Sequence, residues 1–340
     1  MSAPMLRAAR VIVMHRVYAL LAIAVVALSI LNSGFLTEIN IRSLLTEASV
    51  NLLVVAGLTV VLLCGHIDLS VGSVVALGGM VAVGWQDRLG TAGAVVAALA
   101  VGLVIGFING VLVTRLKINS LLATLAMMIV VNGVALSVAN GRTVSSINIQ
   151  PSLALEQPVA LFFSIASLAA IAAVLVLHVA VSQTPWGRDL YVIGGSDDDG
   201  RLSGVPVGRS VTSAFMISGL TAAAGGTILS IGLDTGSPLF GASTLFAVIA
   251  AAVVGGASLF GAEGSVLGSA VGVLVLECVN NGMNLSSVPT DQQTVVNGVI
   301  LLAVVLLDSY FGRRRRRAWN IRTIEREYPR SNALVKGAPP

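Results

Sequence analysis

Two carboxylates stand inside otherwise apolar stretches of this sequence. Asp68 is the only acidic residue within residues 67–85, and Glu277 is the acidic residue of the apolar run 264–283. A carboxylate among membrane-spanning segments must face protein or water, or carry a proton, because lipid cannot solvate its charge. These two residues are therefore the first candidates for a function.

The surroundings of Asp68 form a small polar island, Gly65–Ser73, between two apolar runs. A helix that breaks inside a membrane must bury its freed backbone groups in protein or at a water-filled cavity. Asp68 and Ser70 are suited to cap the next helix by accepting bonds from its free amides. The alternative is a gate, or a hydrogen-bond partner for a polar substrate. We expect His66 to be structural rather than a proton carrier.

Asparagines recur near the ends of the apolar runs. Amide and carboxylate groups recognise sugar hydroxyls, so these side chains could line a polar path. They could equally tie one helix to another, a contact worth about 0.6–2 kcal/mol in membranes. Both interpretations stay open. The candidates for a translocation path or gate are His66, Asp68, Ser70, Asn132, Glu277, Asn281 and Asn284.

Catalytic and metal-binding patterns are missing from the sequence. Its two lysines, Lys117 and Lys336, do not stand in the Gly-Lys-Ser/Thr context of a phosphate-binding loop. No histidine is spaced with a second ligand residue for a metal, and Cys64 and Cys278 are predicted to be small buried hydrophobes. We expect no enzyme activity, bound cofactor or metal. A membrane-embedded enzyme is disfavoured, and any ATP-Mg would be hydrolysed on another chain.

The composition points to a membrane protein. Hydrophobic residues make up 56% of the 340 residues and charged residues 11%, whereas soluble domains carry roughly 25% charged residues. Nine of the twenty Lys and Arg residues follow residue 312, in a tail that begins with Arg313–Arg317. We interpret this tail as an anchor to membrane lipid and not as a nucleic-acid site.

Apolar runs of about 20 residues predict an all-α polytopic protein with about ten transmembrane helices. The predicted spans are 17–33, 44–64, 68–84, 91–113, 119–139, 160–181, 211–231, 243–260, 264–283 and 293–311. Residues 1–16 are expected to form an interfacial segment, 17–311 the transmembrane domain and 312–340 a basic cytoplasmic tail.

The distribution of basic residues sets the orientation. With the N-terminus in the cytoplasm, eight Lys and Arg residues before the tail fall inside and three fall outside. An even number of spans then keeps both termini, and the basic tail, in the cytoplasm, as the positive-inside rule favours.

Two series of glycines recur at four-residue spacing, which lets helices approach closely in lipid. One consists of Gly102, Gly106 and Gly110, and the other of Gly264, Gly268 and Gly272. They would suit either a moving or subunit-facing helix or packing within the chain.

The loop 182–210 is long, charged and predicted to be cytoplasmic. Three aspartates at 197–199 favour the first turn of a short helix, with Ser196 as its cap and Gly204 as its end. Such a helix suits docking into a groove of a partner, and the alternative is a solvated linker.

Several motifs together resemble one known family. Gly65–Ser73 resembles the Gly-Ile-Asp-Leu-Ser-Val-Gly-Ser signature of the ribose-type permease subunits of bacterial ABC importers. The loop with Gly187-Arg188 and Arg201–Val205, the stretch Ala247–Phe260 and the run Asn281–Leu285 follow the same family pattern in order. The resemblance extends over about residues 35–310.

The resemblance implies the membrane subunit of a monosaccharide importer in the bacterial inner membrane, which works by alternating access. Its implied partners are an ATP-binding subunit, an extracytoplasmic sugar-binding protein and a second permease copy, identical or related. The implied contacts to the ATPase are Gly187, Arg188, Gly194, Gly195, Asp198, Arg201, Leu202, Ser203 and Gly204.

One departure and one alternative accompany this resemblance. Ser196–Gly200 replaces the family's Asn-x-x-Ala-Ala, and Gly200 would weaken a coupling helix by up to about 1 kcal/mol relative to Ala. The alternative function is a proton-coupled secondary carrier for a small polar solute, for which Glu277 or Asp68 would carry the proton.

Overall fold

The computed structural model of the chain describes residues 3–303 and 306, and describes the side chains from residue 17 onward. The predicted basic tail 312–340 and the end of the predicted span 293–311 lie outside the described residues. The helices are α1 (Ala3–Leu31), α2 (Glu38–Leu63), α3 (Val71–Gly84), α4 (Gln86–Thr114), α5 (Ser120–Val138), α6 (Gln150–Glu156), α7 (Ile165–Gln183), α8 (Pro185–Gly195), α9 (Asp197–Leu202), α10 (Val207–Gly232), α11 (Phe240–Val254) and α12 (Val266–Leu285).

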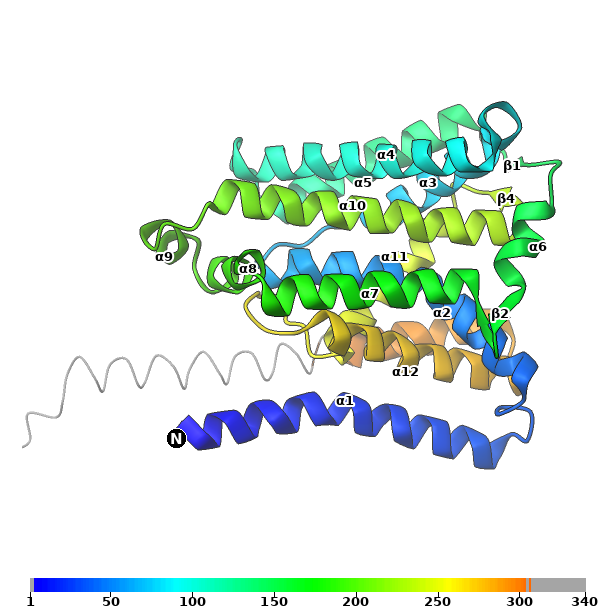
Figure 1. Ribbon diagram of the computed structural model, residues 1–340, viewed down its shortest axis with the longest axis horizontal. Coiled ribbons are helices and arrows are strands. Elements are labelled where there is room, and N and C mark those ends of the chain that lie inside the picture. The colour runs from blue at the N-terminus through cyan, green and yellow to red at the C-terminus, as the bar shows by residue number, and fades with distance from the viewer. Residues whose placement is uncertain (1–2, 304–305, 307–340) are drawn as a thin grey trace, which may run out of the picture.

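The long helices run side by side along one axis of the molecule (Figure 1). Six helices in the described part are long and apolar enough to cross a membrane: α2, α4, α5, α7, α10 and α12. Three shorter apolar stretches, Val17–Leu31, α3 and α11, accompany them, and residues 290–303 are helical as well. The predicted all-α, polytopic class is therefore confirmed, whereas the count of ten spans and the cytoplasmic position of the termini stay predictions.

The predicted span limits agree with the helices to within a few residues at most positions. α4 has a kink at Gly90, where φ is 69°, so its straight part begins where the sequence predicts. α1 runs unbroken from Ala3 to Leu31, through the predicted boundary between an interfacial segment 1–16 and a span. The predicted span 160–181 starts too early, because residues 158–164 form a small hairpin and α7 begins only at Ile165.

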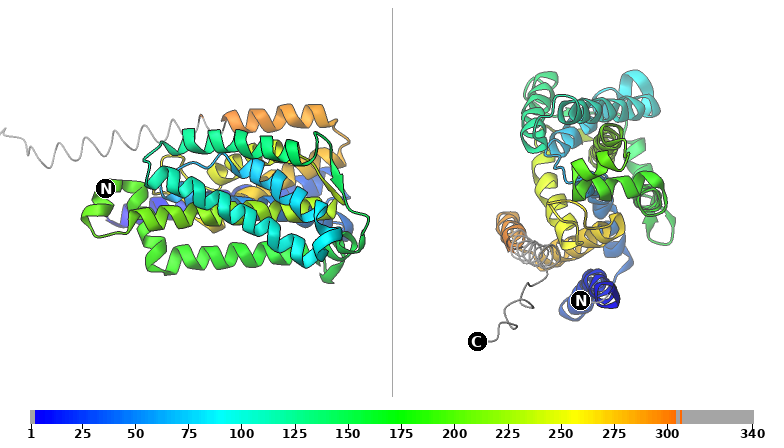
Figure 2. Two further views of the ribbon diagram at one scale, coloured as in Figure 1. Left: turned by 90° about the horizontal axis from the view of Figure 1, so that it is seen from above. Right: turned by 90° about the vertical axis from the view of Figure 1, so that its left-hand side faces the viewer.

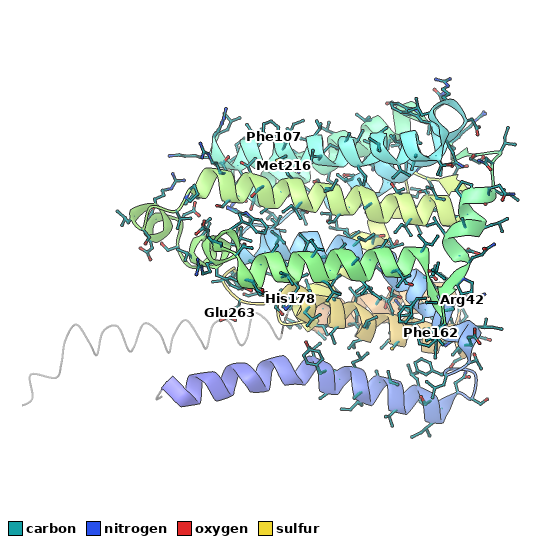
Figure 3. The ribbon with its side chains drawn as sticks, viewed as in Figure 1. Arg42, Phe107, Phe162, His178, Met216 and Glu263 are labelled. Atoms are coloured by element: carbon teal, nitrogen blue, oxygen red, sulfur yellow. The ribbon has the colours of Figure 1, made fainter. Side chains whose placement is uncertain are left out.

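Short strands gather at one end of the bundle. β1 (Val144–Ser145) pairs antiparallel with β4 (Thr235–Gly236), and β2 (Pro158–Ala160) pairs with β3 (Phe163–Ser164). These strands and α6 lie at the end opposite to α8 and α9 (Figure 1). Arg42, which the sequence places outside, lies at the strand end, and Glu263 lies in the half nearer to α8 (Figure 3).

The core of the bundle is built around α10. This helix packs against α2, α3 and α4. The end-on view shows the bundle along its helix axes (Figure 2). The contacts are close because small residues face each other. Gly102 and Gly219 meet backbone to backbone, and Gly106 faces the Phe215 carbonyl.

The first glycine series therefore packs within the chain. A Cβ at any of Gly102, Gly106 or Gly110 would overlap α10. In the second series Gly268 and Gly272 contact α11 in the same way, but Gly264 precedes α12 and has a φ of 124°, which suits glycine. Of the two interpretations in the sequence analysis, packing within the chain is the one that the structure supports.

Gly106→Ala is expected to destabilise the protein, because the new methyl group would overlap the Phe215 carbonyl oxygen. Overpacking of this kind costs about 1–3 kcal/mol. Gly133→Ala is the matched control: it lies within α5, and a Cβ there meets nothing within 4 Å. Thermal unfolding in detergent should show a lower Tm for the first variant only. An equal Tm for both variants would contradict the close packing of α4 on α10.

Candidate functional site

The polar island of the sequence is a stretch of non-helical backbone between α2 and α3. α2 ends at Leu63, Gly65 adopts a positive φ of 77°, and α3 begins at Val71. The segment 64–70 packs against the buried interior, and Asp68 and Ser70 are each 1% exposed. Its freed backbone groups must therefore find partners within the protein.

Side chains of α5 supply several of these partners. Ile67 donates its amide to the Ser120 hydroxyl at 3.3 Å, and Leu69 donates to the Thr124 hydroxyl at 3.0 Å. Thr124 also lies 3.2 Å from the Ile67 carbonyl oxygen, to which it donates. The first turns of α5 therefore hold the broken segment in place.

Asp68 is the centre of an enclosed polar network. Its Oδ1 accepts from the Ser70 amide at 3.0 Å and from the Ser70 hydroxyl at 2.6 Å. Its Oδ2 accepts from the Ser218 hydroxyl of α10 at 2.8 Å, and Asn109 of α4 donates to Ser70 Oγ at 2.8 Å. The four residues connect the start of α3 to two long helices.

The predicted capping function is confirmed for Asp68 and not for Ser70. Asp68 accepts from a free amide at the start of α3, whereas the Ser70 side chain makes no cap bond and instead donates to Asp68. His66 belongs to this segment, and its ring centroid lies 6.1 Å from that of Phe215. All four network residues are at most 1% exposed, so the network is enclosed by protein.

Glu277 lies in a different setting. Its Oε1 accepts from Asn51 Nδ2 of α2 at 2.6 Å, and its side chain is 7% exposed. Both residues line a cavity of about 330 Å³ between α2, α11, α12 and the helical residues 290–303. Of the candidate path residues, Glu277 is the one that faces this cavity.

The other candidate asparagines are dispersed. Asn281 and Asn40 exchange two amide hydrogen bonds, each 2.9 Å long, which tie α12 to α2. Asn284 accepts from Gln293 at 2.8 Å, and Asn132 lies exposed on α5. Asp68 and Ser70 thus contact one group of helices, and Glu277 contacts another. The structure does not bring the seven candidates together in one site.

Sequence reasoning did not select the partners that complete these networks. They are Asn40, Asn51, Ser120, Thr124 and Ser218, whereas the remaining partner, Asn109, is one of the recurring asparagines. Each is a polar residue in or beside a predicted span, and that feature alone could have marked it. Its partner, however, is determined by which helices are neighbours.

The loop 182–210 folds into two helices, where the sequence predicts one. Thr184 caps α8 by accepting from the Gly187 amide, and Ser196 caps α9 by accepting from the Asp199 amide at 3.1 Å. Gly204, with a φ of 78°, follows the end of α9. The predicted cap and end of the short helix are therefore confirmed, and α8 (Pro185–Gly195) is the part that was missed.

The predicted coupling residues divide into two groups in the structure. Gly187 is packed against the Val181 carbonyl at the end of α7, and Gly194 against the Leu63 carbonyl at the end of α2. These glycines fasten α8 to the bundle. The exposed group consists of Arg188, Gly195, Asp198, Arg201, Leu202, Ser203 and Gly204.

The attachment of α8 to the bundle is a contact of three backbones. Gly261, which precedes α12, faces Gly65 and the Gly194 carbonyl, and Ala262 donates its amide to the Leu63 carbonyl at 3.1 Å. Tyr191 adds a hydrogen bond of 2.9 Å from its hydroxyl to the Gly264 carbonyl. A displacement of α8 would therefore act directly on the start of the 64–70 segment.

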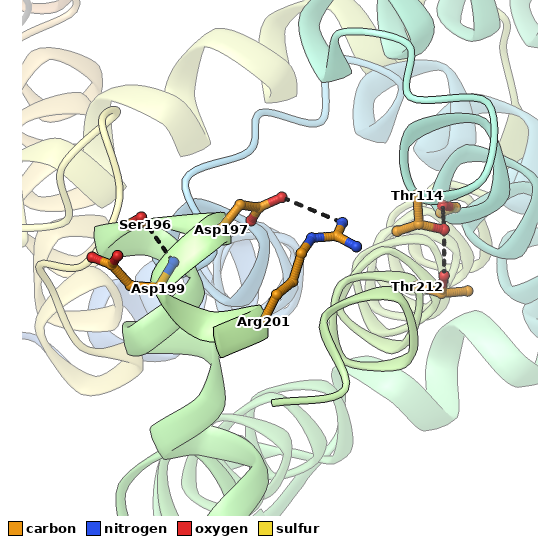
Figure 4. Close-up of polar contacts among 7 residues, drawn as sticks. Thr114, Ser196, Asp197, Asp199, Arg201 and Thr212 are labelled. Atoms are coloured by element: carbon orange, nitrogen blue, oxygen red, sulfur yellow. Dashed lines mark hydrogen bonds and ion pairs between the residues drawn. The ribbon is translucent and has the colours of Figure 1, made fainter. Parts of the chain in front are cut away.

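The outer surface of α9 is only weakly held by its own charges. Arg201 approaches Asp197 at 4.0 Å, and both side chains are about half exposed (Figure 4). Exposed pairs of this kind contribute about 0–1 kcal/mol, so the guanidinium stays available to a partner. Leu202, at 88% exposure, adds an apolar side chain to this surface.

Within the described residues, no group of three or more His, Cys, Asp or Glu residues could hold a metal ion. Cys64 and Cys278 are both buried free cysteines. Their burial agrees with the predicted role as small hydrophobes.

Comparison with known proteins gives one family and several relatives. Residues 40–305 match the family described as branched-chain amino acid transport system / permease component. The ribose import permease protein RbsC of Bacillus subtilis is 36% identical over 294 residues, which cover 85% of this chain and 90% of that protein. The RbsC protein of Escherichia coli K12 is 35% identical, with 85% and 91% covered.

An arabinose transport protein is similar to the same degree. The L-arabinose ABC transporter permease protein AraH of Azospirillum brasilense is 37% identical over 299 residues, which cover 86% of each chain. No solved structure matches the chain.

Asp68→Ala is expected to destabilise the bundle, because it leaves Ser70 and Ser218 without their shared acceptor in an enclosed site. The cost of such unsatisfied groups is about 1–3 kcal/mol each. Asp87→Ala removes an exposed carboxylate that accepts one 3.3 Å bond, and serves as the control. Thermal unfolding in detergent should separate the two variants, with a lower Tm for Asp68→Ala. Equal stability would show that the network around Asp68 contributes nothing.

Proposed function

Because the chain belongs to the family of branched-chain amino acid transport system permease components, we propose that it is the membrane-spanning subunit of an ATP-driven importer of a monosaccharide. Relatives named as ribose and arabinose permeases, which match over most of their length, support a sugar as the substrate. The proposed location is the bacterial inner membrane, with ATP-Mg bound and hydrolysed by a separate ATP-binding subunit.

The observation that supports the proposal best is the exposed helix pair α8–α9. It projects from one end of the bundle (Figure 1), and it is fastened to α2 and α7 through Gly194 and Gly187. An element that is firmly fixed on one side and exposed on the other is suited to receive a force from a partner. We propose that Arg188, Arg201 and Leu202 contact the ATP-binding subunit.

The same geometry suggests how movement reaches the interior. When the ATP-binding subunits close, α8 is displaced together with the backbones at Leu63 and Gly65, which it contacts. The segment 65–70 then moves with the start of α3, because Asp68 links that start to α10 through Ser218. The permease thus alternates between outward and inward openings as its helices rock as rigid bodies.

The opposite end of the bundle is proposed to receive the extracytoplasmic sugar-binding protein. There β1 pairs with β4, and β2 with β3, so that long loops are held in a defined surface. The binding protein supplies the affinity for sugar. A second permease copy, identical or related, would complete the pathway, with membrane lipid around both copies.

The departure at Gly200 is compatible with this assignment. Gly200 is buried in α9, and a Cβ there would make ordinary contacts of 3.6–3.8 Å with Val207, Ile193 and Val192. The space for an alanine is therefore present, and glycine lowers the helix propensity of α9 without altering its packing.

The alternative of a proton-coupled carrier is not favoured by the family membership. It would need a carboxylate that alternates between the two sides, and Asp68 is enclosed by protein. Glu277 is the remaining candidate, and it borders a cavity lined by further polar side chains.

Leu202→Ser is expected to weaken the complex with the ATP-binding subunit, because it removes the most exposed apolar side chain of α9. Loss of an apolar anchor at an interface costs about 1–2 kcal/mol, which corresponds to a loss of affinity of roughly five- to thirtyfold. Leu161→Ser is the matched control: this leucine is 80% exposed in the β2–β3 turn at the other end. Co-purification of the ATP-binding subunit should fall for Leu202→Ser alone. If both variants retain it, α9 is not the docking element.

Sugar uptake by the intact importer is expected to continue when an uncoupler collapses the proton gradient while ATP is maintained. The physical reason is that the movement is powered by ATP binding on the partner and not by a proton on this chain. Uptake of labelled ribose and arabinose into cells is the measurement. Collapse of uptake at constant ATP would instead establish the proton-coupled carrier.

A further inference from the structure

The cavity beside Glu277 differs from every other polar location in the described part of the chain, because its polar groups surround a space. It is lined by Asn51 of α2 and by Glu277 and Asn280 of α12, and Ser243, Thr294 and Asn297 add hydroxyl and amide groups. The four residues of the network around Asp68 are at most 1% exposed and do not line this cavity, although Asn109 Oδ1 in that network is buried without a hydrogen-bond partner among the described residues.

One polar atom at this cavity is buried and has no partner. Asn280 Oδ1 accepts no hydrogen bond from the described residues. A buried amide oxygen without a donor is costly, by about 1–3 kcal/mol, so a ligand that supplies a donor would be bound favourably there. The Glu277 carboxyl group offers about four acceptor directions, and its hydrogen bonds with Asn51 and Asn280 leave acceptor capacity for a ligand.

The depth of the cavity suits a path through the membrane. Asn51 lies about midway along α2 (Glu38–Leu63), and Glu277 lies near the middle of α12 (Val266–Leu285). The volume of about 330 Å³ is at the lower end of the range of roughly 300–1,000 Å³ for small-molecule sites. The cavity therefore has the appropriate size for a compact solute.

The chemistry of the walls selects among compact solutes. Phe246, Leu276 and Val273 form apolar walls, which suit the C–H faces of a sugar ring. One carboxyl group with amides and hydroxyls is a poor site for a divalent cation such as Ca²⁺, which takes six to eight oxygen ligands. A neutral molecule with several hydroxyl groups fits best, since each hydroxyl both donates and accepts.

We propose that this cavity binds the monosaccharide during its passage, with the Glu277 carboxyl group and Asn280 Oδ1 as acceptors for sugar hydroxyls and the Asn51 amide as the residue that positions Glu277. The inference depends on the proposed function, because it assumes that a sugar enters this chain. It adds a sugar-selective site within the permease itself, so the binding protein is not the sole determinant of specificity.

The first experiment measures transport by the assembled importer in proteoliposomes, with its ATP-binding subunit and loaded binding protein. The probes are labelled D-ribose, L-arabinose, D-xylose and D-glucose. We expect Glu277→Gln and Asn280→Ala to reduce the uptake rate at least fivefold and to change the ratio between the sugars. Gly133→Ala, at an exposed position of α5 where a Cβ meets nothing within 4 Å, is the control and should leave both unchanged.

The outcomes separate the two proposals. If the wild-type importer takes up none of the four sugars in the presence of ATP, the proposed function is wrong and the sugar site with it. If the wild type transports a sugar and both cavity variants retain its rate and its selectivity, the site is wrong and the importer assignment stands.

A second measurement guards against variants that merely misfold. In the complex of permease and ATP-binding subunit without the binding protein, Ser243→Cys at the cavity is alkylated with N-ethylmaleimide. The transported sugar should slow this reaction at least threefold, whereas glycine betaine at equal osmolarity should not. Ser145→Cys in β1 is the control and should be unaffected by either compound. If the sugar does not change the alkylation rate of Ser243→Cys, the proposed sugar site is wrong, even if Glu277→Gln abolishes uptake.

Discussion

The fold depends on one stretch of non-helical backbone inside an apolar helix bundle. Between α2 and α3 the chain loses its internal hydrogen bonds where lipid and buried side chains cannot replace them. Ser120 and Thr124 of α5 and the carboxyl group of Asp68 provide the replacements, and Asp68 is itself held by Ser218 of α10. One local break therefore requires that α3, α5 and α10 occupy fixed relative positions. A conformational change must move these helices together or replace those bonds.

Close backbone contacts between helices make the bundle rigid and so keep these helices in their fixed relative positions. α4 meets α10 through facing glycines, and α8 meets the end of α2 and the start of α12 through Gly194, Gly65 and Gly261. Contacts without side chains have little room to deform, because there is no rotamer that could adjust. A displacement applied to α8 is thus passed on and is not absorbed locally. α9 packs on α8 and the start of α10 at Gly200, while its exposed side chains make few contacts with the bundle and are free to conform to a partner.

Asp68 and Glu277 show how the surroundings determine what a carboxyl group can do. Both lie among apolar segments, and both accept hydrogen bonds from polar side chains. Asp68 has both oxygens engaged in an enclosed network, so its contribution is to structure. Glu277 borders a cavity, which the residues of the Asp68 network do not line, so it retains capacity for a ligand. The difference arises from packing and not from residue type.

The sequence by itself determined the class of the protein, the approximate position of its spans, the helix cap at Ser196 and the family. These follow from local properties: apolar content over about 20 residues, turn-forming residues and short motifs. The tertiary structure alone decided which polar residues act together. Ser218 is 150 residues from Asp68, Asn51 is 226 from Glu277 and Asn40 is 241 from Asn281. No local pattern encodes such pairs, because they depend on which helices pack as neighbours, and the same asparagine can tie two helices or face a cavity. The second helix of the loop 182–210 was missed for a related reason, since its glycines look like loop residues until their contacts with α2 and α7 are seen.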